Sequence, residues 1–481
     1  MTVRELEPNI VWRYFEAINA IPRASTKEEE ISAFMVAFGN SLGLETSMDQ
    51  IGNVIIRKAG SSGRENCKTV VLQAHLDMVH QKETGSTFDF DTQGIQMYIE
   101  GDWVKAKDTT LGADNGIGVS AIMAVLASDA LEHPPIEALF TIDEEKGMTG
   151  AMALTKNQLR GEFLLNLDSE EDDEITIGCA GGVDVEIRGS YQTKILDAKE
   201  YELHQIKLGS LKGGHSGVDI HLGSANAILV MSELLNNLIS KVDCRLHSVS
   251  IGALTNVIPR NGMAIMAVRE DKLSSFELEF LAAAERIKRD YQLTDPFMSI
   301  DKVKVNRSTG IMDVNTQNQL ISALLKLPNG VYSMTRGLDD LVQTSSNIAV
   351  LNIEDGSYEI KCHTRSSVNS ERDEMVASIQ ECFPFAQVSE IGPYPGWEPK
   401  PDSELLAIAK ACYEDLNGVV PNVKSIHAGL ECGVIAGMYP KMQMISFGPN
   451  ILGAHSPEER VQVTSVKKFW KFLVKLLQTL E

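Results

Sequence analysis

Long hydrophobic runs are missing from this 481-residue sequence. No segment approaches the ~20 consecutive apolar residues that a membrane-spanning helix needs. Residues 1–8 also lack the basic region and apolar stretch that mark a secretory signal. These absences argue against a membrane partner and against export, so we expect a cytoplasmic protein.

Positive charge is also scarce. The chain has 44 Lys and Arg against 66 Asp and Glu, which gives a formal net charge of −22. Nucleic acids and anionic membranes bind proteins through a basic surface, and this composition disfavours one. We therefore expect no nucleic-acid partner.

Cysteine is sparse and scattered. The seven cysteines never form a Cys-x-x-Cys pair, so the sequence indicates neither a disulfide framework nor a thiolate zinc site. If this chain binds a metal, the ligands must be imidazole and carboxylate groups.

The pattern of apolar segments predicts an α/β fold with an insertion. Apolar runs at 69–74, 136–142 and 163–167 alternate with helical patterns, which is typical of a mixed sheet flanked by helices. Strand-like alternation dominates from residue 183 until a turn-rich Pro-Tyr-Pro-Gly segment, after which the α/β pattern returns. We predict that residues 1–182 and 393–481 form one domain and that residues 183–392 form an inserted α+β domain. Thr26 also predicts a capping box at the start of a helix.

Polar side chains follow the predicted strands. His75 ends the first apolar run, and Asp77 could orient its ring, although a purely structural His–Asp hydrogen bond is the alternative. Asp114 lies in a glycine-rich segment before a predicted helix, where helix capping is the alternative role.

Further acids and a second imidazole follow the same pattern. Three adjacent acids, Asp143, Glu144 and Glu145, follow the run 136–142. Asp168 follows the run 163–167, and His455 belongs to the returning segment. Adjacent acids repel one another unless they are solvated or neutralised by a cation. Because active sites of open α/β sheets lie outside the carboxyl ends of the strands, we expect these residues to lie together.

This set of side chains is suited to Zn, Mn or Co. Two ions need a bridging group, and Asp114 is the candidate carboxylate that would span a pair about 3.5–4 Å apart.

Eight motifs carry a resemblance to a known family; they occupy residues 71–79, 109–116, 144–145, 166–171, 213–217, 256–260, 427–433 and 455–457. Over essentially its whole length, the chain resembles the aminoacyl-histidine dipeptidases. These enzymes are also called peptidase D or Xaa-His (carnosine-type) dipeptidases, and they belong to the clan of two-zinc exopeptidases and deacylases.

The resemblance implies two divalent ions, zinc in the first place. It assigns one ion to His75, Asp114 and Asp168, and the other to Asp114, Glu145 and His455. It also makes Glu144 the general base and gives Asp77 the role of orienting His75. His80 stands where close relatives often have Pro, and we leave it out because five ligands already complete two sites.

The inserted segment resembles the lid domain of the family. The resemblance implies that His215 helps to polarise the scissile carbonyl and that Arg365 pairs with the terminal carboxylate of a peptide. Asn256 would hydrogen-bond to the same end. The alternatives are a core histidine at His215 and a surface ion pair at Arg365.

We therefore predict metal-dependent hydrolysis of unblocked dipeptides, with Xaa-His as the narrower substrate class. The attack would come from a metal-bridging hydroxide, with Glu144 as base. One alternative is an N-acyl amino acid deacylase or carboxypeptidase of the same clan, and another is a non-catalytic metal- or peptide-binding protein. Glu144 argues against the last, because a pure binder has no need of a spare carboxylate there. The partner is a small peptide, and both a monomer and a homodimer stay open.

Overall fold

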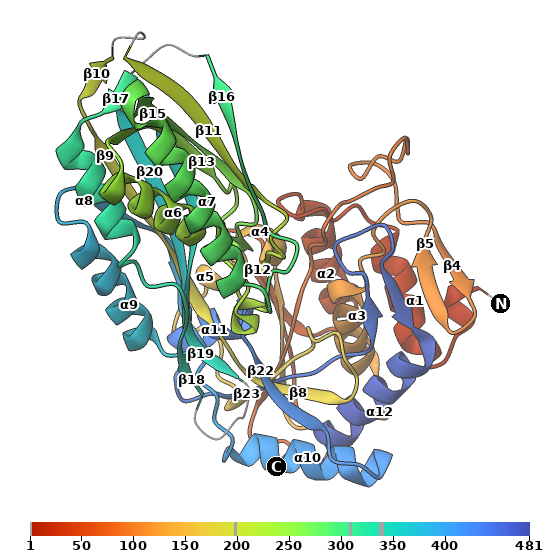
Figure 1. The fold of residues 1–481 in the computed structure, drawn as a ribbon. Coiled ribbons are helices and arrows are strands. Elements are labelled where there is room, and N and C mark those ends of the chain that lie inside the picture. The colour runs from red at the N-terminus through yellow and green to blue at the C-terminus, as the bar shows by residue number, and fades with distance from the viewer. Residues whose placement is uncertain (1, 197–199, 307–309, 336–340) are drawn as a thin grey trace. The chain divides into compact units, whose positions relative to one another are not determined.

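The computed structural model describes residues 2–196, 200–306, 310–335 and 341–481 (Figure 1). The chain divides into two compact units. Unit 1 comprises Met1–Cys179, Trp397–Ser425 and Leu430–Glu481, and unit 2 comprises Ala180–Gly396 and Ile426–Gly429. The sequence pattern did not indicate the short return of residues 426–429 to unit 2.

An eight-stranded sheet forms the centre of unit 1. Its strand order is β1 (Glu45–Met48), β2 (Val54–Lys58), β6 (Ile136–Thr141), β3 (Val70–His75), β7 (Phe163–Asn166), β23 (Gln443–Ser446), β8 (Glu174–Cys179) and β22 (Asn422–Ile426). β3 pairs in parallel with β6 and β7, and β7 pairs in parallel with β23. β1, β2 and β8 join by antiparallel pairing, so the sheet is mixed, as predicted.

The parallel strands explain where the chemistry collects. β3, β6 and β7 are buried along their whole length, which accounts for their nearly continuous apolar sequences. Because they run in the same direction, their carboxyl ends lie at one edge of the sheet. The polar residues that end these strands therefore meet at that edge.

Helices flank this sheet. They are η1 (Val3–Glu5, a 3₁₀ helix), α1 (Asn9–Asn19), α2 (Glu29–Ser41), α3 (Ala113–Ala127), α4 (Glu144–Gly147), α5 (Thr149–Met152), α10 (Glu404–Asn417), α11 (Glu431–Met438) and α12 (Val463–Thr479). α3 is buried on nearly all sides, packs against β3 and lies beside α1 (Figure 1). A helix that is apolar all round needs such an enclosed position. A small sheet of β24 (Ile451–Leu452), β25 (Arg460–Gln462), β5 (Trp103–Ala106) and β4 (Met97–Glu100) completes the unit.

Unit 2 contains a nine-stranded antiparallel sheet. Its strand order is β16 (Ser299–Val305), β11 (Tyr201–Gly209), β15 (Gly262–Arg269), β13 (Cys244–Ile251), β19 (Val342–Glu354), β20 (Ser357–Ser366), β9 (Gly181–Ser190) and β21 (Gln387–Tyr394), with β18 (Gly330–Met334) paired to β19. Alternate residues of these strands enter one large core cluster with the helices. α6 and α7 lie side by side on this sheet (Figure 1).

The remaining elements of unit 2 are short strands and further helices. They are β10 (Thr193–Ile195), β12 (Gly214–His215), η2 (Ile220–Leu222), α6 (Ala227–Lys241), β14 (Val257–Ile258), η3 (Glu270–Lys272), α7 (Leu273–Asp290), β17 (Gly310–Met312), α8 (Val314–Leu324) and α9 (Asn369–Cys382).

The helix start predicted at Thr26 is wrong. α2 begins at Glu29, and its N-cap residue, Glu28, makes no side-chain capping bond. Thr26 has a left-handed φ of 72°, and its amide donates to Glu28 Oε1 over 2.7 Å. The Glu28 side chain therefore folds back on the preceding turn, and no capping box forms.

All seven cysteines lie in the described ranges, and each is a free thiol. Within the same ranges, no helix combines the length and the apolar character that crossing a bilayer requires.

Candidate metal centre

His75 is the last residue of β3, and its two ring nitrogens face different groups. Nδ1 lies 3.1 Å from the carbonyl oxygen of Asp77 and 3.3 Å from Asp77 Oδ1. Nε2 lies 3.2 Å from Asp114 Oδ1 and 3.2 Å from Asp168 Oδ1. An acceptor on Nδ1 fixes the tautomer and leaves Nε2 as the ligand atom.

Asp114 lies between the two imidazoles. Its Oδ1 faces His75, and its Oδ2 lies 3.2 Å from His455 Nε2. Gly112, in the left-handed conformation, occupies the N-cap position of α3, and no side chain caps that helix. Asp114 follows with a non-helical ψ of 110°. The carboxylate contacts the two imidazoles and makes no capping bond to α3, so capping is not its role.

The other two acids complete two groups that share Asp114. Asp168 lies two residues after the end of β7, with its Oδ1 3.2 Å from His75 Nε2, whereas Glu145 Oε2 lies 3.0 Å from His455 Nε2. The side chains of Glu145 and Asp168 are only 4% and 6% exposed, but that of His455 is 54% exposed. The structure thus brings all five predicted ligands together, with the His455 side open to solvent.

Asp77 connects the end of β3 with the acidic turn after β6. Its carboxylate accepts the backbone N–H of Glu144 over 3.0 Å and that of Glu145 over 3.3 Å, besides its contact with His75. Burial raises the pKa of Asp77, but the hydrogen bond and the charge of His75, followed by the Glu144 amide, outweigh burial and lower this pKa overall. Asp77 is therefore a carboxylate that orients both a ring and a turn.

Glu144 opens α4, directly after Asp143, which has a left-handed φ of 54°. Burial raises the pKa of the Glu144 carboxyl well above its ordinary value. A divalent cation nearby would favour the ionised form and lower that pKa. Glu144 has no ion pair among the described residues, so its carboxylate is available for proton transfer.

The charges of the cluster fit a divalent cation. Burial raises the pKa of Asp168 to about 6, and hydrogen bonds to Asp114 and then Glu145 raise that of His455 to about 11. In the described ranges, no Lys or Arg pairs with these carboxylates, and buried Glu145 Oε1 has no hydrogen-bond partner. A divalent cation would supply the positive charge that these clustered carboxylates lack. His75, Asp114 and Glu145 each offer a ligand atom within 4.8 Å of the others. Imidazole and carboxylate donors suit Zn, Mn or Co.

Two neighbouring features do not add to this centre. The His80 ring contacts Phe90 edge-on at 5.7 Å and makes no ion pair with the cluster among the described residues. A second acidic group, Glu171, Asp173 and Glu174, already has Lys424 as its counter-charge.

Buried Glu431 was missed by the sequence reasoning. Its Oε2 accepts from Gln73 Nε2 over 2.6 Å and from Thr141 Oγ1 over 2.7 Å, which links α11 to β3 and β6. The motif 427–433 contains this residue, but nothing in its spacing indicates a fully buried carboxyl group. Arg23 and Glu459 were missed for the same reason.

The predicted substrate residues lie in unit 2. His215 is in strand β12, and its Nδ1 accepts the amides of Gly217 and Val218. Nε2 is therefore the protonated nitrogen and can donate a hydrogen bond. The half-buried ring also differs from a core histidine.

Arg365 is buried, with only 5% of the residue exposed, so it is not part of a surface ion pair. Its Nη1 donates to Tyr394 Oη over 3.2 Å, and no carboxylate pairs with it in the described residues. Burial and then the charge of Arg365 lower the pKa of His215, and they lower that of His427 to about 3. A buried guanidinium without an acidic partner is energetically costly, so the binding of an anion beside it is favoured.

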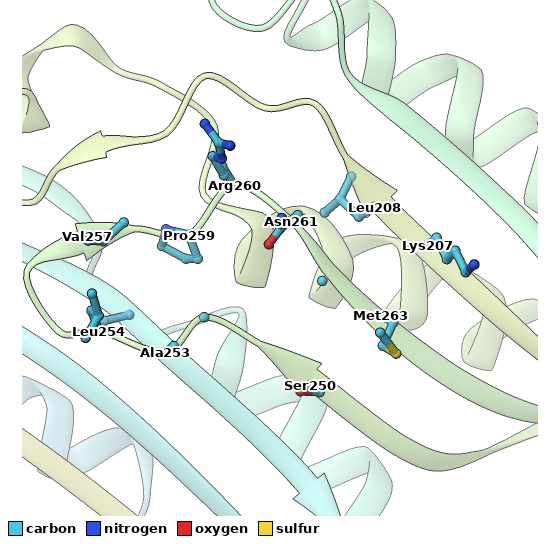
Figure 2. A pocket seen from close by; sticks show the side chains of 13 residues that line it. Lys207, Leu208, Ser250, Ala253, Leu254, Val257, Pro259, Arg260, Asn261 and Met263 are labelled. Atoms are coloured by element: carbon cyan, nitrogen blue, oxygen red, sulfur yellow. The ribbon is translucent and has the colours of Figure 1, made fainter. Parts of the chain in front are cut away.

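Asn256 is exposed on the loop between β13 and β14. The loop borders a hollow of about 640 Å³ in unit 2, and Figure 2 shows its residues Leu254, Val257 and Pro259 with Lys207 of β11. Leu254 and Val257, which lie on either side of Asn256 in the sequence, line this hollow, but Asn256 itself does not.

Comparisons with known proteins agree on one family. The profile of "Peptidase family M20/M25/M40" matches residues 71–479. The chain is 38% identical over 476 residues to the "Cytosol non-specific dipeptidase" of Escherichia coli (strain K12), covering 98% of both chains. It also matches the crystal structure of an aminoacylhistidine dipeptidase from Vibrio alginolyticus, with a TM-score of 0.95 and 39% identity over 100% of this chain and 98% of the other. An aminopeptidase from Bacillus cereus shares the fold, with a TM-score of 0.58 and 16% identity over 98% of both chains.

Proposed function

Because this chain belongs to the peptidase family M20/M25/M40, we propose that it is a metal-dependent dipeptidase that hydrolyses unblocked dipeptides. The observation that carries the proposal is the Asp114 carboxylate, whose two oxygens face His75 and His455. Family membership implies a divalent metal, and the relatives are named as dipeptidases. A preference for Xaa-His is the narrower proposal, and by likeness to the cytosol relative we place the activity in the cytoplasm.

We assign one ion to His75, Asp114 and Asp168, and the other to Asp114, Glu145 and His455. Zinc is the first choice for both, since imidazole and carboxylate ligands suit it. When bound, such ions lower the pKa of water and polarise a carbonyl oxygen.

The side chains of unit 1 then move the proton. Glu144 accepts it from the attacking water and delivers it to the nitrogen of the leaving amine. Asp77 keeps His75 in one tautomer and holds the amides of Glu144 and Glu145, so that the base and the ligand beside it point in different directions.

Unit 2 supplies the groups that recognise the peptide. His215 donates from Nε2 to the scissile carbonyl, where negative charge develops. Arg365 pairs with the terminal carboxylate and Asn256 hydrogen-bonds to the same end, which limits the substrate to short peptides.

Replacement of Arg365 should weaken the binding of peptides with a free carboxyl end. We expect Arg365→Met to raise KM for a dipeptide about 10–100-fold, the size that corresponds to a lost charge-assisted contact of roughly 1.5–3 kcal/mol. For the matching dipeptide with a C-terminal amide, the KM of the variant should be close to that of wild type. Steady-state kinetics on the two substrates test this, with exposed Arg188→Met as control. If the substitution raises KM equally for the dipeptide and for its amide, Arg365 does not bind the terminal carboxylate.

A competition assay separates the dipeptidase from the deacylase alternative. We expect a free dipeptide to be cleaved and its N-acetyl analogue to be poor, because a free α-amino group needs an acid near the centre. Glu170 is the candidate, since burial and the charge of Asp114 raise its pKa to about 8 and an ammonium group would stabilise its ionised form. Initial rates for both substrates in one mixture decide the question. Faster hydrolysis of the acetylated compound would favour the deacylase.

A further inference from the structure

Glu459 binds the loop that carries Asp114. Its Oε2 accepts the backbone N–H groups of Leu111 and Gly112 over 2.6 and 2.9 Å, and its Oε1 accepts those of Ala113 and Asp114 over 2.7 and 3.3 Å. Glu459 is only 2% exposed. One carboxylate thus satisfies four consecutive amides that end at the shared candidate ligand.

Arg23 holds the same loop through a carbonyl group. Its Nη2 donates to Gly112 O over 2.5 Å, while its Nη1 donates to Leu76 O over 3.0 Å and to Asp77 O over 3.1 Å. Arg23 is also 2% exposed. The guanidinium therefore ties the Asp114 loop to the backbone that directly follows His75.

A third contact comes from α1. Asn19 Nδ2 donates to Leu111 O over 3.0 Å, and Asn19 Oδ1 accepts from Arg23 Nη2 over 2.9 Å. The loop is therefore held at its amides by Glu459 and at its carbonyl groups by Arg23 and Asn19. Glu459 follows His455 by four residues, so segments near three candidate ligands are connected in one network.

Such a network is costly to bury. Removing an ionised carboxylate and a guanidinium from water requires compensation by several hydrogen bonds. These hydrogen bonds fix the backbone at Asp114, which has a non-helical ψ and does not cap α3. Each oxygen of Asp114 faces a different imidazole, so a change in its direction would displace both groups of residues that would hold the ions.

We propose that Glu459 and Arg23 are positioning residues that hold Asp114 in its bridging orientation before any metal binds. This inference rests on the metal assignment made above. Partners that orient a metal ligand typically change metal affinity about 10–100-fold when they are replaced.

Metal titration of the apoprotein tests the proposal. Wild type, Glu459→Gln and the exposed neighbour variant Glu458→Gln are titrated with Zn²⁺ in competition with a chromophoric chelator. Glutamine keeps the size of the side chain but turns an N–H donor toward backbone N–H groups. We expect about 10–100-fold weaker affinity for at least one ion in Glu459→Gln and wild-type affinity in Glu458→Gln. Unchanged affinity in Glu459→Gln would overturn the proposal.

Two further measurements separate positioning from simple stabilisation. At saturating Co²⁺, the visible spectrum of Glu459→Gln should differ from that of wild type, because the shared ligand is displaced. Amide hydrogen exchange across residues 111–114 should be faster in the apo variant. If Glu459→Gln lowers Tm but keeps the wild-type Zn²⁺ affinity and Co²⁺ spectrum, Glu459 only stabilises the fold and the inference is rejected.

Arg23→Lys, with exposed Arg13→Lys as control, gives an independent test if Glu459→Gln does not fold. Arg23 donates to four acceptors from two nitrogens, whereas a lysine has three N–H groups on a single nitrogen. Weaker Zn²⁺ binding is therefore expected in Arg23→Lys and not in Arg13→Lys. No peptide takes part in these titrations. A wild type that binds metal without cleaving dipeptides would reject the proposed function and leave this inference standing.

Discussion

Glu144→Gln should keep its metal and lose about 10²–10⁴-fold of kcat on a dipeptide. Glutamine is nearly the same size as glutamate, but it can neither accept the proton of the attacking water nor return one to the amine. Glu144 makes no ion pair with His75 or His455 among the described residues, so its loss leaves the ligand set intact. Metal content by elemental analysis and kcat from steady-state kinetics are the two measurements.

Neighbouring Glu145 provides the contrast. Glu145→Gln removes the carboxylate that lies 3.0 Å from His455 and should lose metal, whereas Glu144→Gln should not. Exposed Glu162→Gln serves as a neutral control. A Glu144→Gln enzyme with near wild-type kcat would take the role of base away from this residue.

Asp114→Ala should lose both ions at once and fall to the activity of chelator-treated wild type. The reason is that each oxygen of Asp114 faces a different imidazole, so a single substitution breaks both groups of ligands. Asp168 contacts only the His75 group, and Asp168→Ala should therefore weaken one ion more than the other. Metal-to-protein ratios after desalting, followed by activity after addition of Zn²⁺, measure the effect.

The comparison of Asp114 with Asp168 also shows what would contradict the assignment. If Asp114→Ala retains one tightly bound ion while Asp168→Ala loses both, the shared ligand is Asp168. Far-UV circular dichroism of each apoprotein accompanies the titration, because a buried acid replaced by alanine leaves a cavity that can destabilise the fold.

Strand ends were the reliable part of the sequence reasoning. β3, β6 and β7 are buried on both faces, so their sequences are nearly continuous apolar runs that stop where the polar residues begin. The amino-acid pattern alone therefore places His75, Glu144, Glu145 and Asp168 at a common edge. His455 depended on the further argument that the α/β pattern returns after the insertion.

Predictions that depended on a few neighbouring residues, such as helix capping, were less reliable. The sequence that begins at Thr26 matches the capping-box pattern. However, Thr26 has a left-handed φ and its amide donates to the Glu28 side chain, so the helix begins at Glu29. Arg365 could equally have been a surface ion pair, and only burial within the nine-stranded sheet removed that alternative. In both cases tertiary packing overrides what a few neighbouring residues prefer.

The sequence by itself determined that an imidazole–carboxylate metal site was possible in this chain and which strand ends would form it, because hydrophobic periodicity is a local property. Only the tertiary structure decided that Asp114 presents one oxygen to His75 and the other to His455. It also placed Glu459 and Arg23 against the loop of Asp114. These contacts join residues more than 50 positions apart, up to 348 positions for Glu459 and Leu111, and no local pattern records such distances.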